Sequence, residues 1–197
     1  VIATGCAREE TSQESQISVE QRRAAINSAM EHIDANRIDE AMAIVSTLVR
    51  KDPISPQTQE TYGIVLLAQS FQYEELGEIT NAFESRKKAL HAYIEACKYS
   101  SSPGMLYLST AQLAQTVNDL TTATTYYKLA HDNNQNDGRP AFFLTQLHLL
   151  EKEWDQAKHW AYESLNRNPD EPYTLLSASL AEAELENCIE AKALSTS

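Results

Sequence analysis

The sequence contains few of the residues that make turns: only five glycines and six prolines in the whole chain. So few of them leave little room for the closely spaced turns of a β-sandwich. Long stretches rich in Ala, Leu, Glu, Gln and Lys favour helices instead. Hydrophobic residues at 42% and charged residues at 22% are ordinary for a soluble folded protein, so the chain can form one large domain or two small ones.

Positive charge is also scarce. Sixteen Lys and Arg stand against 28 Asp and Glu, which gives a formal net charge of −12, and the densest basic run is Arg86-Lys87-Lys88. A chain without a basic stripe is poorly suited to a phosphate backbone, so we expect no nucleic-acid partner. Long apolar runs are missing too, because no stretch approaches the roughly 18 apolar residues that a membrane span needs.

Residue patterns typical of catalysis are missing from the sequence. The three cysteines, at positions 6, 97 and 188, have no metal-ligand spacing, and no two histidines stand three or four residues apart. Nucleotide-binding and hydrolase motifs are absent. Ser85-Arg86-Lys87-Lys88 has the S-x-x-K spacing of a serine–lysine site, but its companion motifs are missing. We therefore predict no enzymatic activity, no catalytic residue, no metal, no cofactor and no small-molecule substrate. Cys97 and Cys188 lie in helical patterns and are interpreted as small buried apolar residues.

What the sequence does contain is a repeat. Alanines recur at a constant interval, at Ala89, Ala123, Ala157 and Ala191, and a proline follows both Ala41 and Ala157 by twelve positions. A fixed period of this size indicates a solenoid, and the interval equals the tetratricopeptide period of about 34 residues. The second-helix positions of that repeat match best, and the surrounding residues that fit are Ala29, Val45, Pro53, Tyr73, Leu76, Gly77, Tyr93, Ala96, Tyr107, Ala111, Ala114, Tyr127, Ala130, Ala141 and Pro169.

The chain therefore resembles tetratricopeptide-repeat proteins over residues 20–194. The resemblance implies an all-α, right-handed α-solenoid of antiparallel helix pairs, with about four repeats and a C-terminal capping helix. We expect repeats at about 22–55, 56–103, 104–137 and 138–171, a cap at 172–197, and thus a helical domain at 18–197. The interval from Ala41 to Ala89 is longer than the period by fourteen positions. These extra residues either elongate the first helix of the second repeat or, if Gly63 takes the consensus glycine position, fall in the turn between its helices.

The N-terminus carries a separate signal. "VIATGC" resembles the end of a bacterial lipoprotein signal, in which Cys6 would become the lipidated first residue of the mature protein. Residues 7–16 are polar, as in the tether that follows such a cysteine, and we predict a disordered tether over 1–17. Ala3 stands where leucine is usual. The alternative is a disordered extension with an incidental cysteine.

The family resemblance also suggests where a partner binds, because in these proteins the first helices line a concave groove. The groove positions carried over to this sequence are Met30, Glu74, Glu78, Leu108, Gln112, Arg139, Phe143, Gln146, Tyr173 and Ser177. Relatives that bind acidic chaperone tails use Lys, Asn and Arg at positions that Met30, Glu75 and Ser109 occupy here, so we expect no such clamp. Phe142 is an alternative to Phe143, since one of two adjacent aromatics should pack between repeats.

Taken together, these patterns predict a scaffold that binds a protein or peptide partner in the groove. The lipoprotein resemblance places it in the bacterial cell envelope, lipid-anchored and facing the periplasm, with a role in envelope assembly. The alternative is a cytoplasmic adaptor of the same fold, similar to a co-chaperone and without a lipid anchor.

Overall fold

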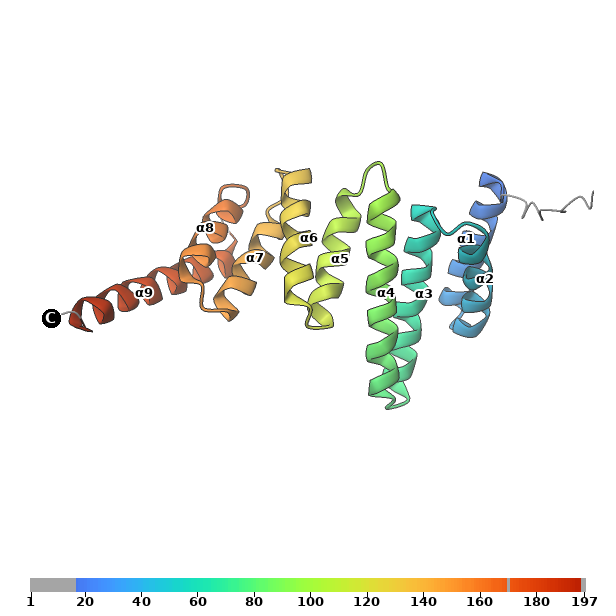
Figure 1. The fold of residues 1–197 in the computed structure, drawn as a ribbon, viewed down its shortest axis with the longest axis horizontal. Helices are drawn as coiled ribbons and strands as arrows, with labels where there is room; N and C mark the ends of the chain where they lie inside the picture. The colour runs from blue at the N-terminus through green and yellow to red at the C-terminus, as the bar shows by residue number, and fades with distance from the viewer. Residues whose placement is uncertain (1–16, 170, 196–197) are drawn as a thin grey trace, which may run out of the picture.

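The computed structural model describes residues 17–169 and 171–195, and its regular elements there are all α-helices (Figure 1). Consecutive helices pack side by side along one row, and each contacts chiefly its neighbours in the chain. The predicted all-α solenoid is thereby confirmed. The helices are α1 (Val19–Asp34), α2 (Ile38–Lys51), α3 (Pro56–Glu75), α4 (Ile79–Tyr99), α5 (Gly104–Thr116), α6 (Leu120–Asn133), α7 (Arg139–Leu150), α8 (Trp154–Leu165) and α9 (Pro172–Ser195).

Four tight turns join the helices in pairs: α1 to α2, α3 to α4, α5 to α6 and α7 to α8. Each turn has three residues, and its middle residue has a positive φ: Asn36, Gly77, Asn118 or Lys152. In every case the N–H of the following residue donates to the carbonyl five residues back, as Glu153 does to His148 at 2.8 Å. This is the Schellman motif, which satisfies the last carbonyls of the first helix. The same turn chemistry therefore closes every pair.

Several helices begin at residues suited to capping them. Ser18 forms a capping box with Gln21, and Ser55 accepts from the Thr58 N–H just before a helix that starts with Pro56. Asp119 accepts from the Thr122 N–H, and Glu171 from the Thr174 N–H. These caps satisfy N–H groups that have no partner inside the helix, so they fix where α1, α3, α6 and α9 begin.

Small residues hold the paired helices together. Ala41, Ala89, Ala123 and Ala157 are fully buried, each near the start or middle of a second helix. Tyr127 is also fully buried and stands four residues after Ala123, where the repeat places an aromatic side chain. The alanines let the helix backbones approach closely, and the larger side chains fill the space between pairs. The alanine period therefore marks the packing seam.

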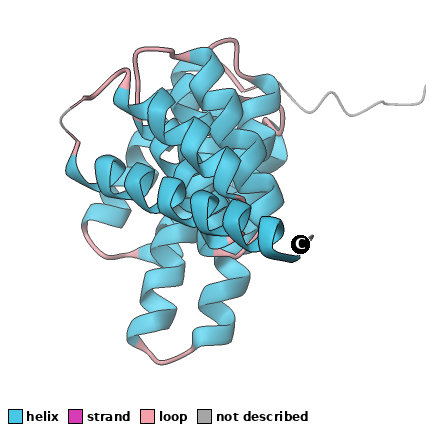
Figure 2. Cartoon of the chain, turned by 90° about the vertical axis from the view of Figure 1, so that its left-hand side faces the viewer, coloured by secondary structure: helices cyan, strands magenta, loops and turns pink. Residues whose placement is uncertain are grey.

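The second pair, α3 and α4, is longer than the others and protrudes from the array (Figures 1 and 2). α3 has 20 residues against 13 in α5, and α4 has 21 against 14 in α6, so each helix is seven residues longer. The elongated first helix is confirmed, but the second helix is elongated by the same amount. The fourteen extra residues thus form helix on both sides of a turn of ordinary length.

Gly63, not Gly77, is the glycine that packs inside this pair. A Cβ on Gly63 would lie 2.6 Å from the ring of Tyr93, whereas one on Gly77 would meet nothing within 4 Å. Gly77 instead supplies the positive φ of the turn. Matching Gly77 to the consensus glycine was therefore wrong, and Gly63 fits this position. The same alternative placed the extra residues in the turn, which was wrong because that turn has three residues like the others.

At the C-terminal end, α9 runs without a break from Pro172 to Ser195 and packs on α8 and α7. Ala191 therefore lies in the same helix as residues 172–187 and does not start a second helix, so its place in the alanine series is coincidental. The predicted lipidation site Cys6 lies outside the described residues. Within the described part of the chain, no helix is both long enough and apolar enough to span a membrane.

Candidate functional site

The odd-numbered helices form one side of the solenoid. Besides the contacts between chain neighbours, α1 touches α3 and α7 touches α9. Two surface hollows, each of roughly 490 Å³, have walls that include side chains of these helices, from α3 and α5 in one hollow and from α5, α7 and α9 in the other. Gln112 of α5 lines both hollows, so the two adjoin at this residue.

The first of these, which we name the α7–α9 hollow, is lined by aromatic side chains and a polar rim. Tyr173 at the start of α9 is 70% exposed, and it shares the hollow with Phe142 and Phe143 of α7. The rim consists of Gln112, Asn136, Asp137, Gly138, Arg139, Ser164, Arg167, Asn168 and Glu171. Three aromatic rings beside a mostly polar rim give the hollow both an apolar contact surface and hydrogen-bonding groups, and binding sites combine these two kinds of contact.

The two phenylalanines have different roles. Phe143 stacks on Tyr127 of α6, with ring centroids 5.1 Å apart and planes 15° apart, and packs against the core. Phe142 meets Phe143 edge to face at 5.4 Å and does not take part in the stacking on Tyr127, although both phenylalanines are partly buried. The expectation that one of the pair packs between repeats is confirmed for Phe143. Phe142 is the ring better placed to receive a partner.

Both guanidinium groups of the hollow are paired within the chain. The Arg139 guanidinium donates to both oxygens of Asp137, at 2.9 Å from Nε and 2.7 Å from Nη2, and this holds the pKa of Asp137 below its ordinary value. Arg167 pairs with Glu163 at 2.8 Å and lowers the pKa of that carboxyl as well. With each guanidinium facing a carboxylate, the hollow suits a partner segment of low charge.

The second hollow, which we name the α3–α5 hollow, lies between the long α3–α4 pair and α5. Phe71 of α3 is 58% exposed here, and the Arg86 guanidinium lies 5.9 Å from the centroid of its ring. The apolar residues Leu67 and Leu113 line the same space. The repeat pattern did not predict this hollow, because the alanine spacing gives no indication of the extra helical turns that contain Phe71.

Four of the predicted groove residues meet in the α7–α9 hollow: Gln112, Arg139, Phe143 and Tyr173. Two others, Gln146 and Ser177, bond to each other at 2.8 Å across α7 and α9, and Ser177 also donates to the Tyr173 carbonyl at 2.8 Å. Their hydrogen-bonding groups join these two helices, and Ser177 is buried. Helix–helix bonding is thus the role the structure gives them.

Other predicted groove residues lie elsewhere. Leu108 is only 5% exposed and belongs to the core, so its assignment to an accessible groove was wrong. Met30 is half-buried on α1. Glu74 and Glu78 are exposed near the tip of the long hairpin, where Glu74 pairs with Arg86 at 2.6 Å and Glu78 accepts from Asn81 at 2.6 Å. These three residues are not brought together with the α7–α9 hollow.

Sequence reasoning missed the loop residues of this hollow. Asn136, Asp137, Arg167, Asn168 and Glu171 come from the connections before α7 and after α8. The family positions were carried over only to the expected first helices and the cap, so they did not include the connections before α7 and after α8. The one available signal was the concentration of Asn and Asp at 132–137 and 166–170, which is typical of turns.

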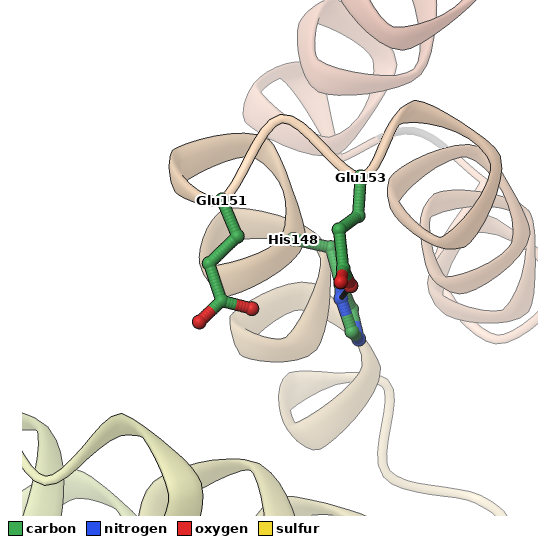
Figure 3. Close-up of side chains that lie close together, drawn as sticks. All are labelled: His148, Glu151 and Glu153. Carbon is green, nitrogen blue, oxygen red and sulfur yellow. Dashed lines mark hydrogen bonds and ion pairs between the residues drawn. The ribbon is translucent and has the colours of Figure 1, made fainter.

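Among the described residues, His148, Glu151 and Glu153 form a cluster that could offer ligand atoms to a metal (Figure 3). These atoms lie within 4.8 Å of one another. Nδ1 of the buried His148 is already engaged with Glu153 Oε2 at 2.7 Å, while the carboxylate of Glu151 lies to one side of that pair. The contact joins the end of α7 to the residue before α8, so it is accounted for as part of the turn.

The S-x-x-K serine is part of the helix packing. Ser85 is buried between α3 and α4, and its hydroxyl bonds to Gln69 Oε1 at 3.3 Å, whereas Lys88 is exposed. Cys97 is buried as expected, with its sulfur 3.4 Å from the Thr110 hydroxyl. Burial raises the pKa of this thiol.

No protein-family model matches the chain, and the search of curated proteins gives no match either. Solved structures do match. YrrB, described as a TPR protein with an unusual peptide-binding site, has a TM-score of 0.66 and 18% identity, over 89% of this chain and 80% of its own. MamA matches with a TM-score of 0.64 and 16% identity, over 88% of this chain and 87% of its own.

A tetratricopeptide repeat protein from Parabacteroides merdae matches with a TM-score of 0.65 and 15% identity, over 84% of this chain and 60% of its own. At these identities the likeness concerns the fold. Together with the helix pairs, the repeated turns and the buried alanines, it identifies this chain as a helical-repeat protein with the tetratricopeptide-repeat fold.

Proposed function

We propose that the chain binds a protein partner through an extended segment that lies in the groove of the odd-numbered helices. The α7–α9 hollow receives an apolar or aromatic side chain of that segment. The observation that carries this proposal is Tyr173, a large aromatic side chain that is 70% exposed in a hollow it shares with Phe142. Tyrosine is enriched among the residues that dominate binding energy at protein interfaces.

The polar rim supports the same mode of binding. Gln112, Asn136 and Asn168 carry amide groups that can donate to and accept from a peptide backbone. The paired guanidinium of Arg139 leaves the hollow without strong selectivity for charge. YrrB, a protein of the same fold, is described as having a peptide-binding site, which makes a peptide the first partner to test.

The test is capture of partners from the source organism with the full chain, comparing wild type with Phe142→Ala/Tyr173→Ala. The matched control is Tyr99→Ala, which removes an exposed tyrosine on α4 outside both hollows. Captured proteins are then measured individually for affinity. We expect the double variant to weaken binding at least about tenfold, or about 1.4 kcal/mol, while the control binds like wild type. Equal binding by all three would refute the groove assignment.

The N-terminal sequence supports a location for this activity. Gly5-Cys6 followed by a polar stretch is similar to a lipoprotein signal, and lipidation of Cys6 would tether the solenoid to a bacterial membrane on its periplasmic side. A role in assembling envelope complexes would follow from such a tether. Mass spectrometry of the protein isolated from its host tests this, since acylated Cys6 is expected at the mature N-terminus. An unmodified Cys6 with upstream residues retained would support the cytoplasmic adaptor instead.

A further inference from the structure

The most unusual feature of the molecule is the protruding end of the α3–α4 hairpin. The positive-φ residues Asn36, Gly77, Asn118 and Lys152 locate the extra residues: successive spacings are 41, 41 and 34. Seven residues thus precede Gly77 and seven follow it beyond the regular spacing. Seven helical residues rise about 10 Å, so the tip stands about that far beyond the other turns (Figures 1 and 2).

The inside of this extension is packed with small side chains. Ser70, Ala82 and Ser85 are buried between the two helices. Polar contacts tie the pair together on the outside, with Arg86 and Glu74 paired at 2.6 Å. Because small residues let the helices pack closely, the extension needs no large apolar residue at its tip to hold it together.

Large apolar residues are nevertheless present at the tip. Leu76 in the turn is 66% exposed and Ile79 at the start of α4 is 64% exposed. Burial of apolar side chains of this size stabilises a protein, but no described part of this chain buries Leu76 or Ile79. Nearby Phe71 is likewise exposed, although it faces the α3–α5 hollow. The exposed pair is therefore available to a partner.

The charged residues next to this pair in the sequence are glutamates, and the nearest basic residues, Arg86 and Lys87, are each paired with one of them. Residues 71–85 contain four glutamates, at 74, 75, 78 and 84, and no Lys or Arg. Glu74 is paired with Arg86, and Glu84 with Lys87 at 3.1 Å. Glu75 and Glu78 flank Leu76 and are exposed, and Glu78 contacts only a neutral amide, that of Asn81. A partner that covers Leu76 and Ile79 would place its own charges against these two carboxylates.

We propose that Glu75, Leu76, Glu78 and Ile79, which we name the hairpin tip, form a second docking surface for a Lys- or Arg-rich amphipathic helix of a partner protein. The apolar face of that helix covers Leu76 and Ile79, and its cations pair with Glu75 and Glu78. An anionic membrane surface is disfavoured by the same carboxylates. The tip binds independently of the α7–α9 hollow, because none of its residues lines that hollow.

The test uses the full chain and a synthetic amphipathic helix of about five turns, with leucines on one face and lysines on the other, titrated by calorimetry at low and moderate salt. Two tip variants are measured, Leu76→Ser/Ile79→Ser and Glu75→Lys/Glu78→Lys. The charge-matched control is Glu31→Lys/Asp132→Lys, which makes the same change in net charge at exposed positions on α1 and α6. Tyr173→Ala separates this site from the groove. Circular dichroism verifies the helix content of each variant.

We expect the peptide to bind the wild type and to bind each tip variant at least about tenfold more weakly, while the control and Tyr173→Ala stay within about twofold of wild type. A peptide that binds the tip variants as well as the wild type, or that fails to bind the wild type, overturns the proposal. Equal weakening by the charge control would also overturn it, because binding would then reflect net charge alone. None of these outcomes bears on the groove, which the capture experiment tests separately.

Discussion

At the scale of single residues, His131 is a buried titratable group at the junction of two helix pairs. Its ring meets Trp160 edge to face at 5.2 Å, and Nε2 lies 3.4 Å from Arg167 Nη2. Burial lowers the pKa of His131 from its ordinary 6.5, and the charge of Arg167 lowers it further. His159 acts in the same direction, while Glu163 and Asp132 oppose the shift without reversing it. The folded chain therefore favours the neutral imidazole.

A pH dependence of stability follows from this. Below a pH of about 6.5 the unfolded chain binds a proton at this position more readily than the folded chain, so the free energy of unfolding falls as the pH falls. Above that pH the histidine is neutral in both states, so it causes no change of the free energy of unfolding with pH. We expect His131→Phe, which keeps the aromatic contact with Trp160, to lose less stability than wild type between pH 7.5 and 5. Urea denaturation at several pH values measures this, and parallel curves for the two proteins would contradict it.

Two of the predicted groove residues lie where a helix begins and line a hollow of the surface. Tyr173 and Arg139 lie at the start of their helices, and both reach the hollow. Leu108 lies in the core because one position along a helix is a rotation of about 100°, which separates this buried residue from its partly buried neighbour Ser109. The weak consensus in the first helices could not resolve that single step.

At the scale of elements, the Schellman turns contain backbone strain that substitutions can test. Lys152 adopts φ of 59° in the α7–α8 turn, a region that L-residues other than Asn and Asp rarely enter. Lys152→Gly is expected to stabilise the protein by roughly 0.5–1 kcal/mol, because glycine adopts this conformation without steric cost. The thermal midpoint of unfolding should rise by a few degrees.

Gly77→Ala is the converse experiment. Its Cβ would meet nothing within 4 Å, so any effect comes from the backbone at φ of 76°. We expect a loss of about 1 kcal/mol, measured by denaturant titration. A Lys152→Gly variant less stable than wild type, or a neutral Gly77→Ala, would show that these turns impose no strain.

The sequence predicted the second helices of the pairs better than the first. Their buried alanines tolerate almost no other side chain, so the period is visible without structural knowledge. The first helices also contribute buried residues, but without an alanine at a constant interval that the sequence alone would reveal. Ala191 shows where the alanine period misleads, since the same interval can arise by chance in a helix rich in alanine. The continuity of α9 could not be read from the alanine spacing.

At the scale of the whole molecule, contacts run mainly between neighbouring helices. A destabilising substitution should therefore affect mainly the helices close to it. Gly63→Ala tests this, because the new methyl would lie 2.6 Å from the Tyr93 ring in the middle of the α3–α4 pair. Overpacking of this kind costs about 1–3 kcal/mol. We expect native-state hydrogen exchange to show loss of protection chiefly in α1–α6, with α8 and α9 least affected.

The control for this experiment is Gly63→Ala/Tyr93→Leu, in which a smaller side chain makes room for the methyl and should recover part of the lost stability. Uniform loss of protection from α1 to α9 would mean that the solenoid unfolds as a single unit. It would then be as cooperative as an ordinary globular domain.

The seven-residue extension of α3 and α4 has a consequence for how such a protein can change. Seven residues fall about 20° short of two full helical turns, so adding them leaves each face pointing almost where it did. Adding a single residue instead would rotate everything beyond it by about 100°. A hairpin of this kind can therefore lengthen only in certain steps, and seven residues, or about 10 Å, is one of them. The α3–α4 pair is longer than the other pairs by one such step. It acts as a spacer whose length can change while the groove beside it keeps its shape.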